Sequence, residues 1–341
     1  MGEALTLARG VVPFPEDANV PTAPTLEGTL VALPTGTGAS RAIEEARELL
    51  MVTGGFPDLL LKAGGDLYEQ AAGTGDTMSP RRDRRDVLGR HLVIAREALG
   101  EQLAGRGVLQ DMPHTSGAQQ PAQLQRLLFA LAAQITGLLS AESLARNLQV
   151  AKATVERHVR HLEGAYLIFT LPNYSRNEGT SQRRGRKVYF WDGAVRNAVL
   201  ERNKLPFDDP QDYGKLLENL VATALRSYAE CAGMSMYHWR RGGREVDFVL
   251  DGPHGPLAFE VASSLRHSRA GQHALAATHG EFADRCYLVS PRARVIPAAE
   301  SRDGVGTIPL DALLLAASAQ ADLASAQRLE TAIRNMPSDF D

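Results

Sequence analysis

The sequence predicts a mixed α/β protein, in which a helical N-terminal part precedes a helix-turn-helix and then a sheet. Three observations lead to this prediction. Apolar residues recur at helical spacing in the first part of the chain. A short helix, a tight turn and a second helix follow between residues 142 and 162. Two later strands alternate polar and apolar residues, with Asp247 on the first and Glu260 on the second.

The composition is that of a globular protein. The chain has 341 residues, 44% hydrophobic and 23% charged, which suffices for two or three domains. Its formal net charge of -3 means that any surface for nucleic acid must be local. No apolar run approaches the ~20 residues of a membrane helix, and the first residues lack a signal-peptide pattern. We therefore expect a cytoplasmic protein without a membrane partner, and we expect Cys231 and Cys286 to be buried thiols.

The chain is predicted to begin irregularly and then to become helical. Residues 1–38 are rich in Pro, Gly, Thr and Ala, and the stretch 31–41 lacks the Gly-Lys-Ser/Thr ending of a phosphate loop. Residues 39–52 then have apolar positions at helical spacing, and Pro57 suits the first turn of a following helix. We place a helical region at residues 39–138.

A winged helix is predicted for residues 139–205. Helices at about 142–148 and 152–162 are followed by two strands around a polar loop at 175–187. Residues 141–188 contain nine Lys or Arg and four acidic residues, a local charge of +5. The solvent face of the second helix is expected to include His158 and His161. The side chains predicted to contact the phosphates of DNA are Lys152, Arg157, Arg160, Arg183, Arg184, Arg186 and Lys187.

The last folded part is predicted at residues 206–320, followed by a C-terminal helix or tail at 321–341. A long helix begins after Asp209-Pro210 and carries an apolar stripe with Glu218 at its edge. Three strands come next, then an amphipathic helix and the strand 285–290, whose apolar character on both faces is typical of a central strand.

The carboxylate pair indicates a site on this sheet. By strict alternation, Asp247 and Glu260 share one face, while Val246, Phe248 and Leu250 point the other way. Two close carboxylates repel each other unless a proton or a cation joins them. A hard divalent ion such as Mg²⁺ or Mn²⁺ is one such cation. Nucleases of the PD-(D/E)xK type have an Asp and then Glu-x-Lys in this arrangement, but Ala262 stands at the lysine position.

The ordered set of motifs resembles a group of bacterial and archaeal AAA-type ATPases, whose C-terminal half is domain of unknown function 4143. The motifs are GGFPDLL, VERHVRHLEGAYLI, KVYFWDGAVRNAV, GKLLENLVATAL, YHWRRGGREVDFVL and AFEVASS, between about residues 39 and 290. The resemblance implies a winged helix followed by a restriction-endonuclease-like domain. It also implies that Glu218, Asp247 and Glu260 are the catalytic and metal-binding carboxylates. The ATPase motifs of the family are not found, so a separate ATPase is the partner that the resemblance suggests.

Three functions are compatible with the sequence. The first is a nucleic-acid-binding protein with a degenerate nuclease fold, because losing one electrostatic group of this kind typically costs ~10²–10³ in rate. The second is a Mg²⁺-dependent DNA nuclease with a relocated lysine, for which Lys215, one helical turn before Glu218, is the candidate, with Arg244 and Arg266 as other choices. The third is a non-catalytic interaction module, in which Asp247 and Glu260 pair with Arg240, Arg244 or Lys215.

Overall fold

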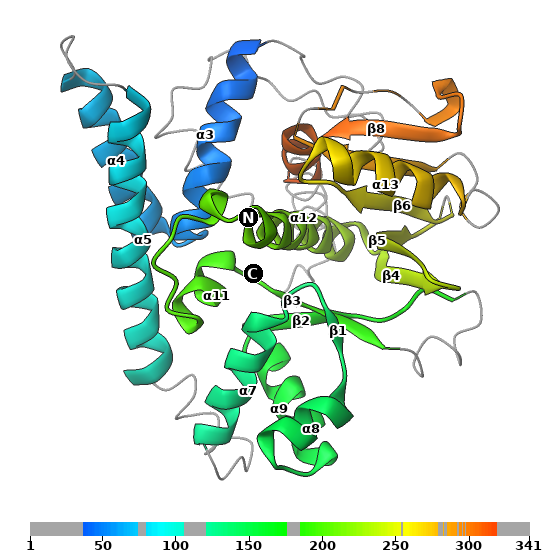
Figure 1. Ribbon diagram of the computed structural model, residues 1–341, viewed down its shortest axis with the longest axis horizontal. Helices are drawn as coiled ribbons and strands as arrows, with labels where there is room; N and C mark the ends of the chain where they lie inside the picture. Colours follow the sequence, from blue (N-terminus) through cyan, green and yellow to red (C-terminus); the bar gives the residue numbers. More distant parts are fainter. Residues whose placement is uncertain are drawn as a thin grey trace, which may run out of the picture.

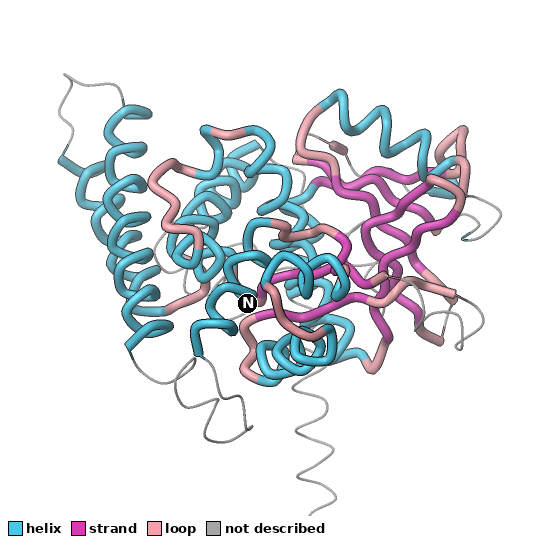
Figure 2. The backbone as a smooth tube through the Cα atoms, turned by 60° about the horizontal axis from the view of Figure 1, so that its bottom comes forward, coloured by secondary structure: helices cyan, strands magenta, loops and turns pink. Residues whose placement is uncertain are grey.

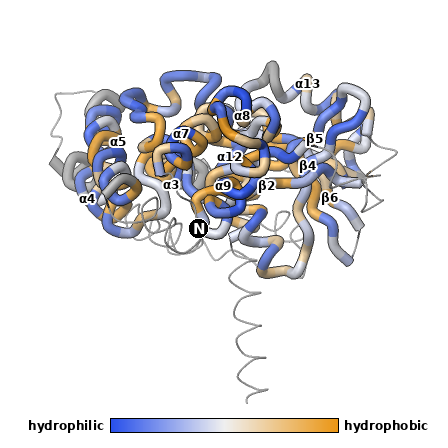
Figure 3. Tube along the Cα trace, turned by 90° about the horizontal axis from the view of Figure 1, so that it is seen from below, coloured by the Kyte–Doolittle hydropathy of each residue, from blue (hydrophilic) through white to orange (hydrophobic). Residues whose placement is uncertain are grey.

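A computed structural model gives the mixed α/β fold, and its N-terminal part is helical (Figure 1). The residues that the structure describes are 37–73, 80–105, 121–175, 185–253, 255–278, 282, 285–291, 293–294, 296 and 298–318. The predicted tail at 321–341 and nearly all of the irregular segment at 1–38 lie outside these ranges. Along the described helices, polar residues alternate with apolar ones, as α9 and α12 show in Figure 3.

The N-terminal part consists of three helices packed side by side. They are α3 (Thr37–Thr53), α4 (Pro57–Gly73) and α5 (Pro80–Gly105). Their apolar stripes meet in one cluster that includes Leu49, Leu60 and Leu88, all fully buried. The turn between α3 and α4 is made by Gly54, which has a φ of +70°. The predicted helix at 39–52 and the helical start at Pro57 are thus confirmed.

The middle part places three helices against a small antiparallel sheet of strand order β1-β3-β2. In chain order its elements are α7 (Pro121–Ala133), β1 (Leu138–Leu139), α8 (Ala141–Leu148), α9 (Lys152–Gly164), β2 (Ile168–Leu171) and β3 (Arg186–Phe190). Ser140 caps α8 by accepting a hydrogen bond from the Ser143 amide, and Gln149 ends it in the left-handed conformation. The two predicted helices and their tight turn are confirmed within two residues.

The C-terminal part is a five-stranded mixed sheet of order β4-β5-β6-β7-β8, whose strands are drawn in magenta in Figure 2. Its elements are α11 (Gly193–Val199), η1 (Pro206–Asp208), α12 (Pro210–Ala232), β4 (Ser235–Arg241), β5 (Arg244–Asp251), β6 (Leu257–Val261), α13 (Leu265–Ala276), β7 (Cys286–Ser290), η2 (Ala298–Glu300) and β8 (Val305–Pro309). Helix α12 packs on one face and α13 on the other. Strand β7 is an inner strand of the sheet, as predicted, because it pairs with β6 on one side and β8 on the other. Strand β8 is an edge strand that was not predicted from the sequence.

Strand β5 is irregular at Asp247. Trp239 of β4 faces Val246, but Tyr237, two residues earlier, faces Val249, three residues later. The extra residue on β5 is a bulge, which bends a strand and re-aims its side chains.

The bulge makes the strict alternation predicted for this strand wrong at one residue. Val246 packs with Val249 and with Leu275 of α13, whereas Phe248 lies in the other cluster, against α12. The predicted common face of Val246 and Phe248 is therefore corrected. The pairing of β5 with β6 is regular beyond this point.

Buried polar side chains join the three parts of the molecule. Arg196 of α11, 1% exposed, forms a bidentate ion pair with Asp212 of α12, with Nη1–Oδ2 at 2.9 Å and Nη2–Oδ1 at 2.5 Å. Its Nε donates to the Ala132 carbonyl of α7 at 3.2 Å. The next residue, Asn197, donates to the Met51 carbonyl of α3 at 3.2 Å. Four helices are thereby held in fixed relation around the β2–β3 strands.

Two further expectations concern thiols and membrane spans. Neither Cys231 nor Cys286 forms a disulfide; Cys286 is buried, but Cys231 is only half-buried at the end of α12. None of the helices that the structure describes has the length and apolar character needed to span a membrane.

Candidate functional site

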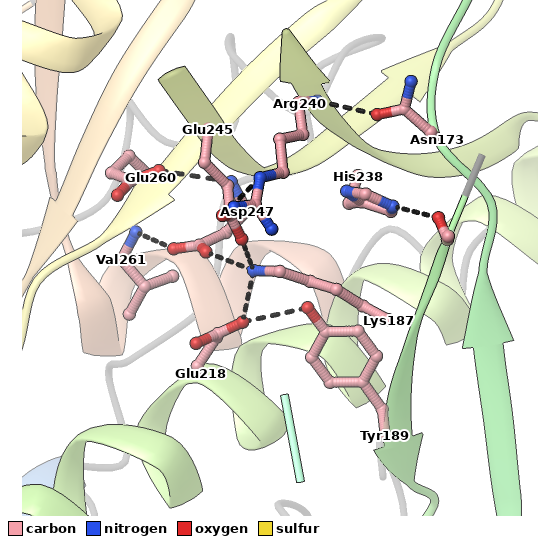
Figure 4. A network of polar contacts seen from close by, with 11 residues as sticks. Asn173, Lys187, Tyr189, Glu218, His238, Arg240, Glu245, Asp247, Glu260 and Val261 are labelled. Atoms are coloured by element: carbon pink, nitrogen blue, oxygen red, sulfur yellow. Dashed lines mark hydrogen bonds and ion pairs between the residues drawn. The ribbon is translucent and has the colours of Figure 1, made fainter. Parts of the chain in front are cut away.

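The predicted carboxylates lie close together at the irregular point of β5 (Figure 4). Asp247 and Glu260 are neighbours across β5 and β6, where the Asp247 amide donates to Glu260 Oε2 at 3.2 Å. The Val261 amide in turn donates to Asp247 Oδ2 at 3.0 Å. Glu218 reaches the same place from α12. Two strands and one helix thus contribute one acid each.

A lysine from the middle part of the chain lies among these acids. Lys187 of β3 places its Nζ 2.9 Å from Asp247 Oδ1 and 3.2 Å from Glu218 Oε1. The same Nζ lies 2.7 Å from Glu245 Oε1. Lys187 is only 3% exposed, so its ammonium replaces most of its hydration by carboxylate contacts. The group of Lys187, Glu218, Glu245, Asp247 and Glu260 is called the carboxylate cluster below.

Tyr189 joins this cluster from the same face of β3. Its hydroxyl donates to Glu218 Oε1 at 2.9 Å, and the ring is fully buried between Phe169 and Phe248. Residues two apart on a strand share a face, which explains why Lys187 and Tyr189 enter the cluster together. Val188 and Phe190 point the opposite way, into the core of the middle part.

The position of β3 is fixed by the chain on either side of it. After β2, Asn173 forms a parallel bridge with His238 of β4. The His238 amide donates to the Pro172 carbonyl at 3.0 Å. Before β3, the Gly185 carbonyl lies 2.9 Å from His238 Nε2. The middle part therefore docks on the edge strand β4, and this docking directs Lys187 into the C-terminal part.

Burial and mutual repulsion shift the pKa values of the acids in the cluster. Burial, reinforced by the charge of Asp247, raises the pKa of Glu218 to about 7. The same two causes raise the pKa of Glu260 well above its ordinary value. Burial disfavours the charged form of Lys187, but the facing carboxylates, Asp247 first, outweigh it and raise its pKa well above the ordinary value. The two glutamates therefore keep their protons to a higher pH than exposed glutamates do, while the lysine keeps its charge.

The open side of the cluster is formed by Glu245 and Arg240, whose side chains are 37% and 49% exposed. Arg240 Nε lies 3.8 Å from Glu245 Oε2, and its backbone amide donates to Asn173 Oδ1 at 2.7 Å. Arg244 turns away and donates from Nη1 to the Ala277 carbonyl at 2.5 Å. The expected pairing of Asp247 with Arg240 or Arg244 is therefore corrected, because Lys187 takes that place.

The lysine expected near Glu218 is a different residue in the structure. Lys215 is half-buried on α12, and its charge acts on Asp212. Ala262, at the lysine position of the Glu-x-Lys pattern, is 1% exposed in the apolar cluster with Leu275. A lysine there would bury its stem among apolar residues, whereas β3 brings an ammonium to the acids from the opposite side.

The carboxylates do not fit a metal ion in this arrangement. In the part of the chain that the structure describes, no three His, Cys, Asp or Glu side chains have the spacing of a metal site. The expected ligands Glu218 and Asp247 both contact the Lys187 ammonium, which lies where a shared cation would have to lie. The expected Mg²⁺ or Mn²⁺ site is thus occupied by an internal cation.

The predicted basic surface divides into three groups. Lys152, Arg157, Arg160 and Arg186 are exposed, although Lys152 is paired with Glu142 and Glu156. Arg183 and Arg184 lie outside the described residues. Lys187 is removed from this surface, since it is buried in the carboxylate cluster.

One more residue of α9 departs from its predicted place. His158 was expected on the solvent face, but it is 3% exposed, and neither ring nitrogen has a hydrogen-bond partner. Burial lowers its pKa, which keeps the ring neutral at neutral pH. The basic face of α9 therefore consists of its lysine and arginines.

Two family models match the chain. Residues 213–313 match the domain of unknown function DUF4143, as the resemblance implied for the C-terminal part. Residues 101–205 match a second domain of unknown function, DUF8612. No solved structure gives a significant match.

Curated relatives are uncharacterized proteins. One from Methanocaldococcus jannaschii, MJ1637, is 32% identical over 42% of this chain and 30% of its own length. One from Mycobacterium tuberculosis, Rv2008c, is 28% identical over 59% of this chain and 45% of its own length. The chain therefore spans less than half the length of the curated relatives it matches.

Proposed function

We propose that this chain is a nucleic-acid-binding protein whose nuclease-like domain does not cut. The observation that carries the proposal is the Lys187 ammonium, which lies between Glu218 and Asp247 in place of a divalent ion. A tethered cation neutralises the acids without supplying a water for attack on phosphorus. A separate ATPase is the partner that the family resemblance suggests.

The middle part supports binding to DNA. Its order of helix, strand, two helices and two strands, with an antiparallel sheet, is the order of a winged helix. The second helix of the pair, α9, exposes Arg157 and Arg160 on the face where such helices contact DNA. The C-terminal part supports the nuclease-like assignment, because one helix and two strands bring together Glu218, Asp247 and Glu260 as in PD-(D/E)xK enzymes.

We expect the wild-type protein to bind duplex DNA in a salt-dependent manner. The double change Arg157→Ala/Arg160→Ala should weaken binding about tenfold and lower the slope of log K against log salt by about 2. Fluorescence anisotropy with a labelled duplex and a single strand measures both quantities. The matched control is Arg269→Ala/Arg302→Ala, which removes two exposed arginines from the C-terminal part. Absence of salt-sensitive binding by the wild type would overturn the proposal in favour of an interaction module.

A metal-dependent nuclease with a relocated lysine is the second candidate, and Lys187 favours it in one respect. Its Nζ is 2.9 Å from Asp247, which supplies the ammonium missing at Ala262. Incubation of labelled DNA with Mg²⁺ or Mn²⁺ decides between the two candidates when Asp247→Ala is run in parallel. If the wild type cleaves DNA and Asp247→Ala does not, the protein is a nuclease. If neither protein cleaves DNA, the result supports a protein that binds without cutting.

A further inference from the structure

The β4–β5 hairpin presents arginines beside the carboxylate cluster. Its two-residue turn, Gly242-Gly243, has φ angles of +58° and +79°, the left-handed conformation that such tight hairpins need. Arg240 faces Glu245 across the strands, and Arg241 faces Arg244 in the last pair. All three arginines are exposed. The neighbouring pairs point to opposite faces, so Arg240 lies on the face of the cluster.

Glu245 is held between two cations. One carboxylate oxygen lies 2.7 Å from Lys187 Nζ, and the other lies 3.8 Å from Arg240 Nε. Unlike Glu218 and Asp247, whose side chains are 17% and 10% exposed, Glu245 is 37% exposed. It is thus the acid of the cluster that solvent, and a ligand, can reach most easily.

We propose that Lys187 and Arg240 form a binding position for one phosphate of a nucleic-acid backbone, which the Glu245 carboxylate occupies in the free protein. The inference rests on the proposed nucleic-acid binding. A carboxylate and a phosphate present similar pairs of anionic oxygens to an ammonium and a guanidinium, so one can replace the other. Displaced from the two cations, Glu245 can turn to solvent, because its side chain is at the rim.

The hairpin favours a polymer over a small anion. Arg241 and Arg244 are opposite each other in the last pair at the tip, where Arg244 donates to the Ala277 carbonyl. Together with Arg240, they spread positive charge over both faces of the hairpin. A chain of phosphates can contact several such arginines in succession, whereas a single phosphate group contacts one face. The surface is separate from α9, so the two basic regions would contact different parts of one nucleic acid.

The test is a pair of substitutions that are expected to change the affinity for an oligonucleotide in opposite directions. Glu245→Gln removes the competing charge with little change of shape and should tighten oligonucleotide binding about fivefold. Arg240→Gln should weaken binding about fivefold and lower the salt slope by about 1. In the double variant the gain from Glu245→Gln should largely disappear, because Arg240 no longer completes the phosphate position. Anisotropy titrations over a range of salt measure all three, and thermal melts verify folding.

The matched control for Glu245→Gln is Glu230→Gln. Glu230 is also an exposed glutamate paired with a cation, 2.8 Å from Arg226 Nε, but it lies on α12 away from both α9 and the carboxylate cluster. If Glu245→Gln tightens binding no more than this control, or if Arg240→Gln has no effect, the inference is overturned while binding through α9 stands. If neither the wild type nor Glu245→Gln binds, both the inference and the proposed function fail. If the Glu245→Gln variant binds the oligonucleotide and the wild type does not, the result supports the phosphate position and shows that Glu245 blocks it.

Discussion

Replacing Lys187 by methionine is expected to lower the free energy of unfolding by about 3–5 kcal/mol at pH 7. Methionine fills much of the volume of the lysine stem but leaves Asp247, Glu218 and Glu245 facing one another without the cation. Removing one partner of a buried ion pair leaves an uncompensated buried charge, which costs more than the pair itself contributes. Urea denaturation monitored by circular dichroism measures the change.

The control is Lys215→Met on α12, which removes a half-buried lysine outside the cluster and should cost less than about 1 kcal/mol. A second variant, Lys187→Met/Asp247→Asn, should recover part of the lost stability, since the charge left by the first change is removed. Equal stability of Lys187→Met and the wild type would show that the ammonium does not hold the cluster together. If Lys187→Met fails to fold, recovery of folding in the double variant still tests the pairing.

The convergence of the acids could be predicted because it depends on local rules. Side-chain alternation within β5 and β6 and the antiparallel pairing of these strands place Asp247 and Glu260 side by side. The position of Glu218 at the edge of an apolar stripe likewise marks where α12 meets the sheet. What alternation did not reveal is the bulge at Asp247, because nothing in the sequence of β5 distinguishes an extra residue from a regular one.

The lysine of the cluster was missed for a different reason. Lys187 was assigned to a basic surface because residues 141–188 have an excess of Lys and Arg. The number of charged residues in a segment does not indicate which of them are buried. A signal was available in the strand itself: in Arg186–Phe190, Lys187 shares a face with Tyr189, while Val188 and Phe190 form the other face. Because the three residues that follow it, Val188, Tyr189 and Phe190, are all apolar or aromatic, a lysine there belongs to a buried strand. Its partner, 60 residues further along the chain, depends on the docking of the middle part on β4.

Acidification from pH 7.5 to pH 4.5 should stabilise the wild-type protein relative to Glu218→Gln by up to about 3 kcal/mol. Burial and the charge of Asp247 raise the pKa of Glu218 from 4.5 to about 7. A carboxyl whose pKa is higher in the folded than in the unfolded protein binds its proton more tightly when folded. Its stabilising effect is complete below 4.5 and is lost as the pH rises through about 7.

The comparison with Glu218→Gln separates the carboxylate cluster from other groups that titrate in the same range; Glu260, whose pKa the charge of Glu218 helps to raise, remains part of the difference. His158 and His238 have pKa values lowered first by burial, so they destabilise the fold as the pH falls, in both proteins alike. Lys187 contributes no change here, because its raised pKa confines its loss of charge to alkaline pH. Denaturation curves at half-unit pH intervals give the difference directly. A difference that is flat between pH 4.5 and pH 7.5 would mean that Glu218 is ionised throughout, and hence that the Lys187 ammonium outweighs both its burial and its repulsion from Asp247.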